Sequence, residues 1–209
     1  MSDTPAPLKV GALIFPGFEL LDLFGPLEMF GMLKEGASIT VLAEKAGIVR
    51  SSQGPEAVAT EALGGSHGLD ILLVPGGIGT RKLAENAAFI AELRSQCEKA
   101  RYVATVCTGS GLVARTGVLD GRRATSNKFS FRWASSQGPA VTWVRKARWV
   151  EDGKFFTSSG VTAGMDMALG LIARVRGRDP AIEAANGTEY TWHENSAWDP
   201  FAKLNGLVP

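Results

Sequence analysis

The stretch A-T-V-C-T-G-S-G at residues 104–111 decides how this chain is organised. The apolar run that leads into it, residues 102–106, predicts a buried strand, and residues 111–115 have the apolar spacing of a helix. Cys107 stands at the junction, where a strand passes directly into a helix at the carboxyl edge of a sheet. This pattern indicates a nucleophile elbow with cysteine in place of serine and without the usual leading glycine. The free N–H groups at the start of the helix favour a thiolate there.

Length and charge limit the classes of protein to consider. A chain of 209 residues fits one domain, and we predict a single domain over 1–209 with a core at about 9–190 and an irregular tail at about 190–209. Charged residues make up 21% of the chain and the net charge is +1, so we expect neither nucleic acid nor a membrane surface as a partner. The short basic cluster at 145–148 is interpreted as a solvated strand face.

The cysteine count and the chain start bear on compartment and cofactors. Two cysteines, Cys97 and Cys107, cannot build a disulfide framework, and zinc-type spacing is absent, so no metal or cofactor is expected. Cys97 falls on the apolar side of a predicted helix at 87–99 and is interpreted as inert packing. Residues 1–7 are polar and rich in proline, unlike a signal peptide, and no apolar run approaches the roughly 18 residues of a membrane span. We therefore expect a cytoplasmic protein.

Short apolar runs that alternate with helical patterns predict the fold class. The runs typical of buried parallel strands are 9–15, 38–43, 70–74 and 102–106. Further patterns predict two short strands within 47–60, a hairpin around 151–157, and helices beginning near Leu27, Lys128 and Val161. The chain is therefore predicted to be α/β, with a mostly parallel central sheet and helices on both faces.

A carboxylate follows the first predicted strand. Asp22 lies among Leu20, Leu21, Leu23 and Phe24, and such apolar surroundings raise the pKa of a carboxyl group unless it is hydrogen-bonded. The alternative is a helix cap or turn residue, which spacing alone leaves equally open.

A glycine-rich turn follows the strand at 70–74. Residues 75–80 read P-G-G-I-G-T, a turn that points backbone N–H groups at whatever lies above the sheet edge. It matches neither the dinucleotide nor the Walker pattern, so phosphate binding is unsupported. The functional interpretation is a site for a developing negative charge, and the alternative is a tight turn without a further role.

Four motifs in consistent order resemble one family. They are L-D-L-x-G-P at 21–26, V-P-G-G at 74–77, V-C-T-G-S at 106–110 and G-V-T-A-G-M-D at 160–166. Together they resemble the ThiJ/PfpI (DJ-1-like) superfamily, and within it the isonitrile (isocyanide) hydratase branch. The resemblance implies a flavodoxin-like, glutamine amidotransferase-like sandwich and a homodimer. Similar motifs occur in transcription regulators with a C-terminal helix-turn-helix domain, which we do not expect here because only about 20 residues follow the core.

The resemblance also implies roles for individual residues. Cys107 matches the nucleophile, and Asp22 matches the acidic residue that hydrogen-bonds it. Gly77 and Thr108 match positions whose backbone N–H groups, with the Thr108 hydroxyl, stabilise negative charge and position the substrate. Many relatives have histidine where this chain has Asn127, and an amide cannot act as a general base.

The two histidines, His67 and His193, lie at no matching place. A Cys-Asp pair is therefore favoured over a Cys-His dyad. We expect an isonitrile hydratase-like lyase that acts on a small molecule, adding water through a Cys107 thioimidate with Asp22 as general acid and base. Asp22 is expected to lower the pKa of Cys107. The alternatives are a glyoxalase, deglycase or amidohydrolase of the same superfamily, or a cysteine redox or stress sensor.

Overall fold

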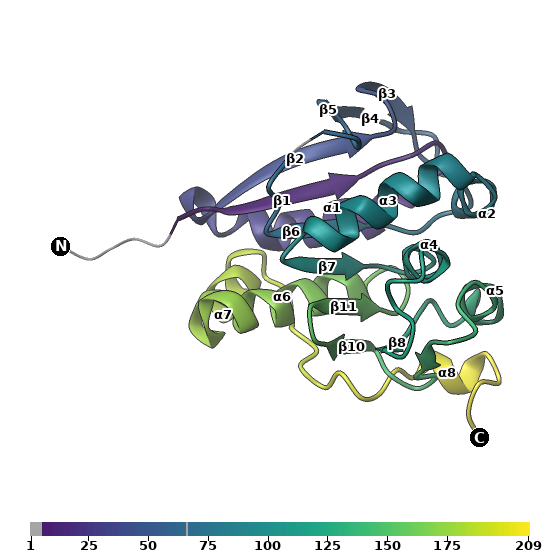
Figure 1. Cartoon of the computed structure of the whole chain (residues 1–209). Helices are drawn as coiled ribbons and strands as arrows, with labels where there is room; N and C mark the ends of the chain where they lie inside the picture. Colours follow the sequence, from purple (N-terminus) through teal and green to yellow (C-terminus); the bar gives the residue numbers. More distant parts are fainter. Residues whose placement is uncertain (1–5, 66) are drawn as a thin grey trace.

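The computed structural model describes residues 6–65 and 67–209, and its centre is one twisted sheet (Figure 1). Among the described residues this sheet has seven strands, in the spatial order β10 (Trp149–Asp152), β11 (Phe155–Ser158), β7 (Tyr102–Thr105), β6 (Ile71–Val74), β1 (Leu8–Leu13), β2 (Ala37–Ala43) and β5 (Glu61–Ala62). Every neighbouring pair is parallel except β10 with β11. The prediction of a mostly parallel sheet is confirmed.

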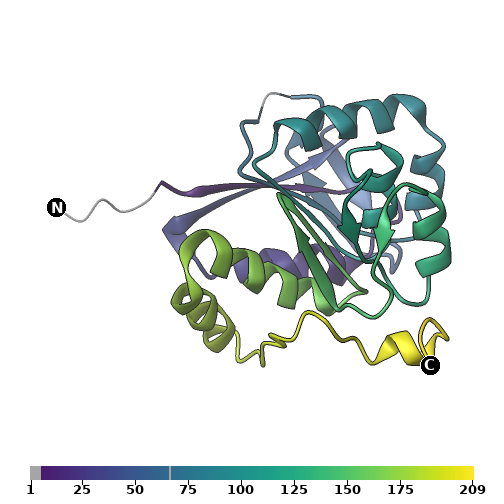
Figure 2. The same ribbon diagram turned by 60° about the horizontal axis from the view of Figure 1, so that its bottom comes forward.

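Helices cover both faces of the sheet, as Figure 2 shows. One layer contains α1 (Leu20–Gly31), α6 (Ala163–Arg176) and α7 (Arg178–Gly187), and the other contains α2 (Thr80–Ala84), α3 (Ala87–Lys99), α4 (Gly109–Arg115) and α5 (Phe131–Ser136). This three-layer arrangement follows from the sequence, because parallel strands buried on both faces need helical crossovers to connect them. The predicted α/β sandwich is confirmed.

Smaller elements lie at the rim. The strands β3 (Gly47–Arg50) and β4 (Glu56–Ala59) form the antiparallel pair predicted within 47–60. A two-residue parallel pair joins β8 (Arg123–Ala124) and β9 (Thr142–Trp143), a short 3-10 turn covers Lys34–Gly36, and α8 (Phe201–Leu204) lies near the C-terminus. No helix in the described part of the chain is long and apolar enough to cross a bilayer.

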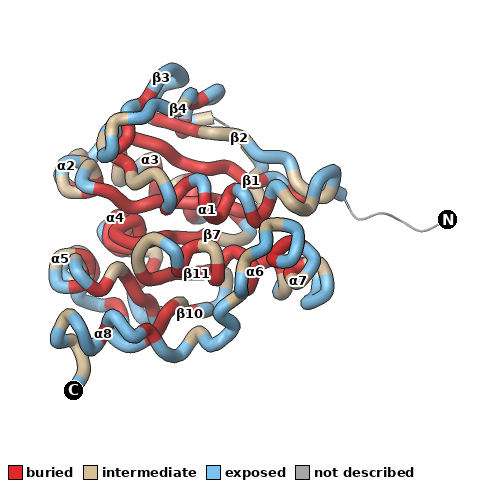
Figure 3. Tube along the Cα trace, turned by 180° about the vertical axis from the view of Figure 1, so that it is seen from behind, coloured by how far each residue is buried: buried red, intermediate tan, exposed pale blue. Residues whose placement is uncertain are grey.

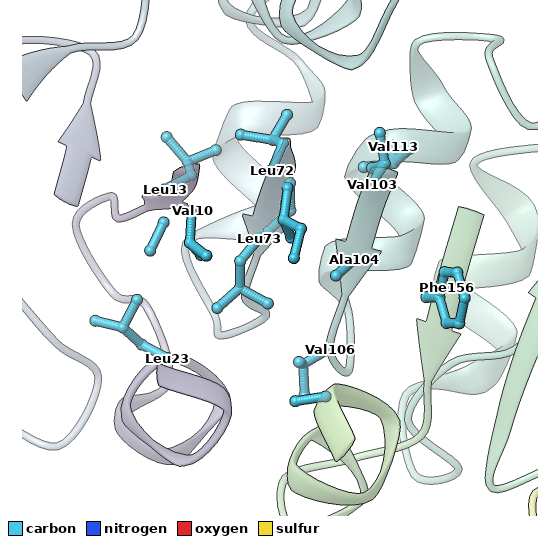
Figure 4. Close-up of a cluster of buried hydrophobic side chains, with 14 of the residues drawn as sticks. Val10, Leu13, Leu23, Leu72, Leu73, Val103, Ala104, Val106, Val113 and Phe156 are labelled. Carbon is cyan, nitrogen blue, oxygen red and sulfur yellow. The ribbon is translucent and has the colours of Figure 1, made fainter. Parts of the chain in front are cut away.

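The hydrophobic core lies on both sides of the central strands (Figure 3). Every residue of β6 is buried, as expected of a strand covered on both faces. Leu23 from α1 packs on one face and Val113 from α4 on the other, and both are completely buried (Figure 4). This packing fixes the carboxyl edge of β6 and β7 between two helical layers, and the candidate site lies at that edge.

Three helix starts differ from the prediction, and α1 matters most. It begins at Leu20 instead of near Leu27, because Gln53 from the β3–β4 turn accepts a hydrogen bond from the Leu20 N–H at 3.2 Å. This contact spans 33 residues, so local spacing could not show it. Asp22 therefore lies in the first turn of α1. Pro26 is inside the helix, where it has no N–H to donate to the Asp22 carbonyl.

The other two helices begin later than predicted. α5 begins at Phe131 because residues 127–130 form a turn in which Asn127 Oδ1 accepts the Ser130 N–H at 2.8 Å. α6 begins at Ala163 after a backbone with positive φ at Val161. Both shifts come from irregular backbone beside the elbow.

The interpretation of residues 145–148 as a solvated strand face holds for the exposed Arg145 and Lys146, but the segment precedes β10 and Arg148 is in a buried ion pair. Arg148 is buried, and its Nε donates to Asp166 Oδ2 at 2.6 Å. The other oxygen of Asp166 accepts the Tyr190 hydroxyl at 3.0 Å and the His193 N–H at 2.8 Å. Asp166 therefore ties the tryptophan-rich tail to α6 and to the strand edge.

Candidate active site

Cys107 adopts the strained backbone of a nucleophile elbow. It follows β7, precedes α4, and has a φ of +57°, in the left-handed region that non-glycine residues rarely occupy. Such a conformation costs on the order of 1–3 kcal/mol and persists only where neighbouring contacts impose it. The sequence prediction of an elbow is therefore matched by the geometry of the chain.

Buried hydrogen bonds impose this conformation on Cys107. Its N–H donates to the Ser159 carbonyl at 3.1 Å, beyond the end of β11. Its own carbonyl accepts the hydroxyls of Ser126 at 2.8 Å and Ser110 at 2.9 Å. All three serines are buried. The peptide groups on both sides of Cys107 are thus held by three separate segments, which leaves the side chain to project from a fixed point.

Asp22 is the carboxyl group nearest this point and is completely buried. Its Oδ2 accepts the Gly76 N–H at 2.9 Å, while Oδ1 has no conventional hydrogen-bond partner among the described residues. Burial is the main cause that raises the pKa of Asp22, and the Gly76 hydrogen bond opposes it. With a smaller rise from the negative charge of Glu19 and a smaller fall from Cys107, the pKa reaches about 7. The prediction of a raised pKa is confirmed, and the carboxyl group can hold or release a proton near neutral pH.

Gly76 permits this close approach because it has no side chain. A methyl group on its Cα would lie 2.6 Å from the Thr108 nitrogen, 2.7 Å from Thr108 Oγ1 and 2.8 Å from Asp22 Oδ2. Residues from β6, α1 and α4 therefore meet around one glycine.

The pKa of Cys107 departs from the expectation. Burial raises the pKa of the thiol well above its ordinary value, and the negative charge of Asp22 raises it further. The N–H and the hydroxyl of Thr108 lower it through hydrogen bonds to the sulfur, but they do not outweigh burial. The prediction of a lowered pKa is wrong for the resting protein, because it considered the acid form of Asp22 and omitted the desolvation of the sulfur. The pair rests as a thiol beside a carboxyl group.

The two residues predicted to stabilise negative charge are linked to each other. The Gly77 N–H donates to Thr108 Oγ1 at 3.1 Å, so in this structure it supports the threonine hydroxyl. Gly77 has a φ of +127°, and its Cα lies so close to residues 17–19 that a side chain there would collide with their backbone. The Thr108 hydroxyl donates to the Gly77 carbonyl at 3.3 Å, and both its N–H and its hydroxyl lower the pKa of the adjacent Cys107 thiol. A direct contact between Gly77 and a substrate stays a prediction.

Asn127, which we expected to stand in place of a histidine, has structural contacts. Its Oδ1 accepts the Ser130 N–H, and its amide nitrogen lies against Gly160, where a methyl group would be 1.9 Å away. His67 bonds to Glu61 through Nδ1 at 3.0 Å, and the His193 N–H is held by Asp166. Neither histidine has a hydrogen bond to Cys107 or Asp22.

Sequence reasoning missed Arg81, on α2. This half-buried guanidinium lies 4.1 Å from the ring centre of Trp133 and donates to Thr80 Oγ1 at 2.9 Å. Burial lowers the pKa of Arg81, and the negative charge of a Cys107 thiolate partly opposes that fall. Spacing gave no signal for this residue, because its contacts come from α5 and from the turn before α2.

A cavity of about 250 Å³ lies beside the elbow. It is lined by residues that flank Ser126 and Ser159 and by α8, among them Asn127, Phe129, Gly160, Val161, Phe201 and Asn205. A separate cavity of about 290 Å³ lies beyond the ends of β1 and β2, and no candidate site residue lines it. Across residues 6–65 and 67–209, no three histidine, cysteine or acidic side chains gather in a way that could hold a metal.

The fold and the elbow agree with comparisons to known proteins. Residues 8–174 match the DJ-1/PfpI family, and this chain belongs to it. The isonitrile hydratase of Pseudomonas putida is 36% identical over 174 residues, which cover 83% of this chain and 75% of that protein. A crystal structure of a THiJ/PfpI family protein from Pseudomonas syringae has a TM-score of 0.82 at 34% identity, covering 91% of this chain and 78% of the other.

The family also contains other kinds of protein. The HTH-type transcriptional regulator GbdR of Pseudomonas aeruginosa is 29% identical over 83% of this chain, which spans about half the length of that regulator. The crystal structure of Drosophila melanogaster DJ-1beta, with a TM-score of 0.77 at 22% identity, covers 89% of this chain and all of the other, and shares the fold. Membership therefore establishes the fold and leaves the chemistry to be argued from the site.

Proposed function

We propose that this protein hydrates isonitriles to N-substituted formamides, with Cys107 as nucleophile and Asp22 as general acid and base. The observation that carries the proposal is the buried Asp22 carboxyl group. It has a pKa of about 7, interacts with the strained Cys107, and has an Oδ1 without a conventional partner among the described residues. The similarity to an isonitrile hydratase supports the same reaction. The carbon of an isonitrile needs both a soft nucleophile and a proton, and this pair supplies the two together.

The first step forms a carbon–sulfur bond. Before the reaction Cys107 and Asp22 share one proton, which lies on the thiol while Asp22 is ionised. Transfer of that proton from the thiol to Asp22 gives a thiolate beside a carboxylic acid. The thiolate attacks the terminal carbon of the isonitrile, and Asp22 gives its proton to the same carbon. The product is a thioimidate, R–N=CH–S–Cys107, with Asp22 ionised.

The second stage consumes one water. Ionised Asp22 takes a proton from the water as its oxygen adds to the thioimidate carbon, and then passes that proton to the nitrogen. When the carbon–sulfur bond breaks, the hydroxyl proton returns to Asp22 and the thiolate leaves. The sum is one isonitrile and one water converted to one formamide, with the pair restored.

Thr108 is proposed to steady the charge on sulfur in both stages. Its N–H and hydroxyl lower the pKa of the Cys107 thiol, and the Gly77 N–H helps to position that hydroxyl. A single preorganised donor of this kind is worth about 3 kcal/mol in other enzymes.

The remaining proposals concern assembly, domain organisation and compartment. We infer a homodimer, because Leu21 and Phe24 on α1 are 38% and 47% exposed beside the buried Asp22. A partner seated on this apolar face would restrict the approach of water to the pair. The chain is proposed to act as one domain on a small molecule. The two free cysteines support a reducing cytoplasm.

A panel of alkyl and aryl isonitriles tests the reaction. We expect formamide to appear in equal amount to the isonitrile consumed, and Cys107→Ala to reduce the rate to that of buffer. Methylglyoxal belongs in the same experiment, since lactate formation at enzymatic rates would instead favour a glyoxalase. The absence of formamide from every isonitrile would refute the proposal.

A further inference from the structure

Arg81 is a cation without an acidic partner beside the elbow. No Asp or Glu oxygen among the described residues lies within 4 Å of its guanidinium, although the other partly buried arginine of this region, Arg148, is paired with Asp166. Its position is nevertheless fixed. One nitrogen donates to Thr80 Oγ1 at 2.9 Å and the other to Ser130 Oγ at 3.0 Å, and the group stacks on Trp133.

A chain of hydrogen bonds leads from Arg81 to Thr108. The fully buried Thr80 hydroxyl accepts from Arg81, lies 3.2 Å from Thr108 Oγ1, and donates to the Gly77 carbonyl at 2.7 Å. Arg81 also donates to that carbonyl, at 3.3 Å. The chain therefore ends at the threonine that contacts the Cys107 sulfur.

This arrangement bears on where the single proton of the Thr108 hydroxyl points. In the structure the hydroxyl donates to the Gly77 carbonyl at 3.3 Å. That carbonyl also accepts a shorter bond from Thr80 and a bond from Arg81, so the bond from Thr108 is readily given up. When the Cys107 thiolate forms next to it, the Thr108 hydroxyl is free to turn to the sulfur, which agrees with its lowering of the pKa of that thiol.

We propose that Arg81 is a positioning residue that stabilises the Cys107 thiolate through Thr80 and Thr108, and that it supplies the positive charge that a histidine would supply at an elbow of this kind. The proposal rests on the assignment of Cys107 as the nucleophile. It needs no contact between Arg81 and the sulfur.

Asn127 supports the same cation from the turn before α5. Its side chain holds the Ser130 N–H at 2.8 Å, and the Ser130 hydroxyl accepts from Arg81. The residue that we expected in place of a histidine therefore supports the turn that anchors the guanidinium. Among the charged groups here, Glu19 acts on Asp22, Asp22 acts on Cys107, and the Cys107 thiolate acts on Arg81.

The test is the rate at which neutral iodoacetamide alkylates Cys107, measured from pH 6 to 11 by intact mass. Alkylation of the native protein measures Cys107 and not Cys97. Cys97 is completely buried, and burial raises the pKa of Cys97 to about 12. We expect Arg81→Gln to move the profile upward by about one pH unit, which slows alkylation at pH 8 about tenfold. Arg81→Lys, which keeps the charge, should recover part of that rate. The exposed neighbour Lys82→Gln is the matched control and should leave the profile unchanged.

Two results would overturn the proposal. One is a wild-type profile in Arg81→Gln, and the other is an equal slowing in Arg81→Gln and Arg81→Lys, as a purely structural role would give. If Arg81→Gln does not fold, Thr80→Val breaks the same chain and keeps the cation, and an unchanged profile there also refutes the proposal. Alkylation uses no isonitrile, so this result is independent of whether hydration is the reaction.

Discussion

The backbone N–H of Gly76 donates to Asp22 Oδ2 at 2.9 Å and thereby joins the end of β6 to the first turn of α1. This bond holds one carboxyl oxygen and leaves the other, Oδ1, without a conventional partner among the described residues. The carboxyl group therefore has a fixed orientation and a vacant acceptor. Those are the two properties that proton transfer to and from Cys107 requires.

Gly76→Ala should impair the site and displace the backbone around it. The added methyl group would lie 2.6 Å from the Thr108 nitrogen and 2.8 Å from Asp22 Oδ2, so it separates the two residues that contact Cys107. We expect formamide formation to slow about a hundredfold, a common result of misplacing a catalytic group by about 1 Å. The control is Gly31→Ala, also in the described chain, where a methyl group meets nothing within 4 Å. Equal activity in the two variants would contradict the assigned role of Gly76.

Asp22→Asn should stabilise the protein at alkaline pH. The pKa of Asp22 is raised in the folded state from 3.8 to about 7, so the folded protein holds a proton that the unfolded chain has released. Its contribution to stability is full below pH 3.8 and is lost as pH rises through 7, a difference of roughly 4 kcal/mol at most. Urea unfolding at pH 5 and pH 8.5 measures this. The free energy of unfolding of the variant minus that of wild type should be larger at pH 8.5 than at pH 5. If this difference is the same at both pH values, Asp22 titrates normally.

Ser126→Ala should loosen the elbow. Its hydroxyl donates to the Cys107 carbonyl at 2.8 Å in a buried position, and the loss leaves that carbonyl with the Ser110 hydroxyl and a longer backbone bond. We expect the free energy of unfolding to fall by about 1 kcal/mol. The rate of formamide formation should fall by more than this loss of stability alone would cause, because the elbow loses its fixed conformation. The exposed Ser136→Ala, whose hydroxyl donates to the Trp133 carbonyl, is the comparison. A fully active Ser126→Ala would show that the strain needs no support from this residue.

Asp166→Ala should release the tail. It leaves Arg148 buried without its partner and removes the acceptor for Tyr190 and His193. Breaking a buried pair from one side costs about 3–5 kcal/mol, so both stability and resistance of residues 188–209 to trypsin should fall. Glu151→Gln removes an exposed ion pair with Arg174 and should change neither. Unchanged proteolysis in Asp166→Ala would show that other contacts hold the tail.

The sequence sufficed for the parts that depend on local pattern. Apolar runs located the parallel strands, and the direct passage from residues 102–106 into a helix located Cys107 at the elbow. The apolar neighbours of Asp22 correctly indicated a raised pKa. Each of these follows from side-chain periodicity or composition within about ten residues.

The parts that escaped prediction depend on contacts between distant residues. The early start of α1 needs Gln53, and the burial of Arg148 needs Asp166. Arg81 meets Trp133 only because α2 and α5 both pack near α4. The pKa of Cys107 was mispredicted because the desolvation of a sulfur depends on everything that covers it.

The mass of Cys107 during turnover shows most directly whether this cysteine carries the substrate. The wild-type protein is mixed with an aryl isonitrile, quenched in acid within milliseconds and digested for mass spectrometry. We predict that the Cys107 peptide gains the mass of one intact isonitrile molecule, that this species forms before the formamide and decays as the formamide appears, and that Cys107→Ser shows no such species. Formamide released at the full rate by Cys107→Ser, or a wild-type burst with no modified Cys107, would contradict covalent hydration by this pair.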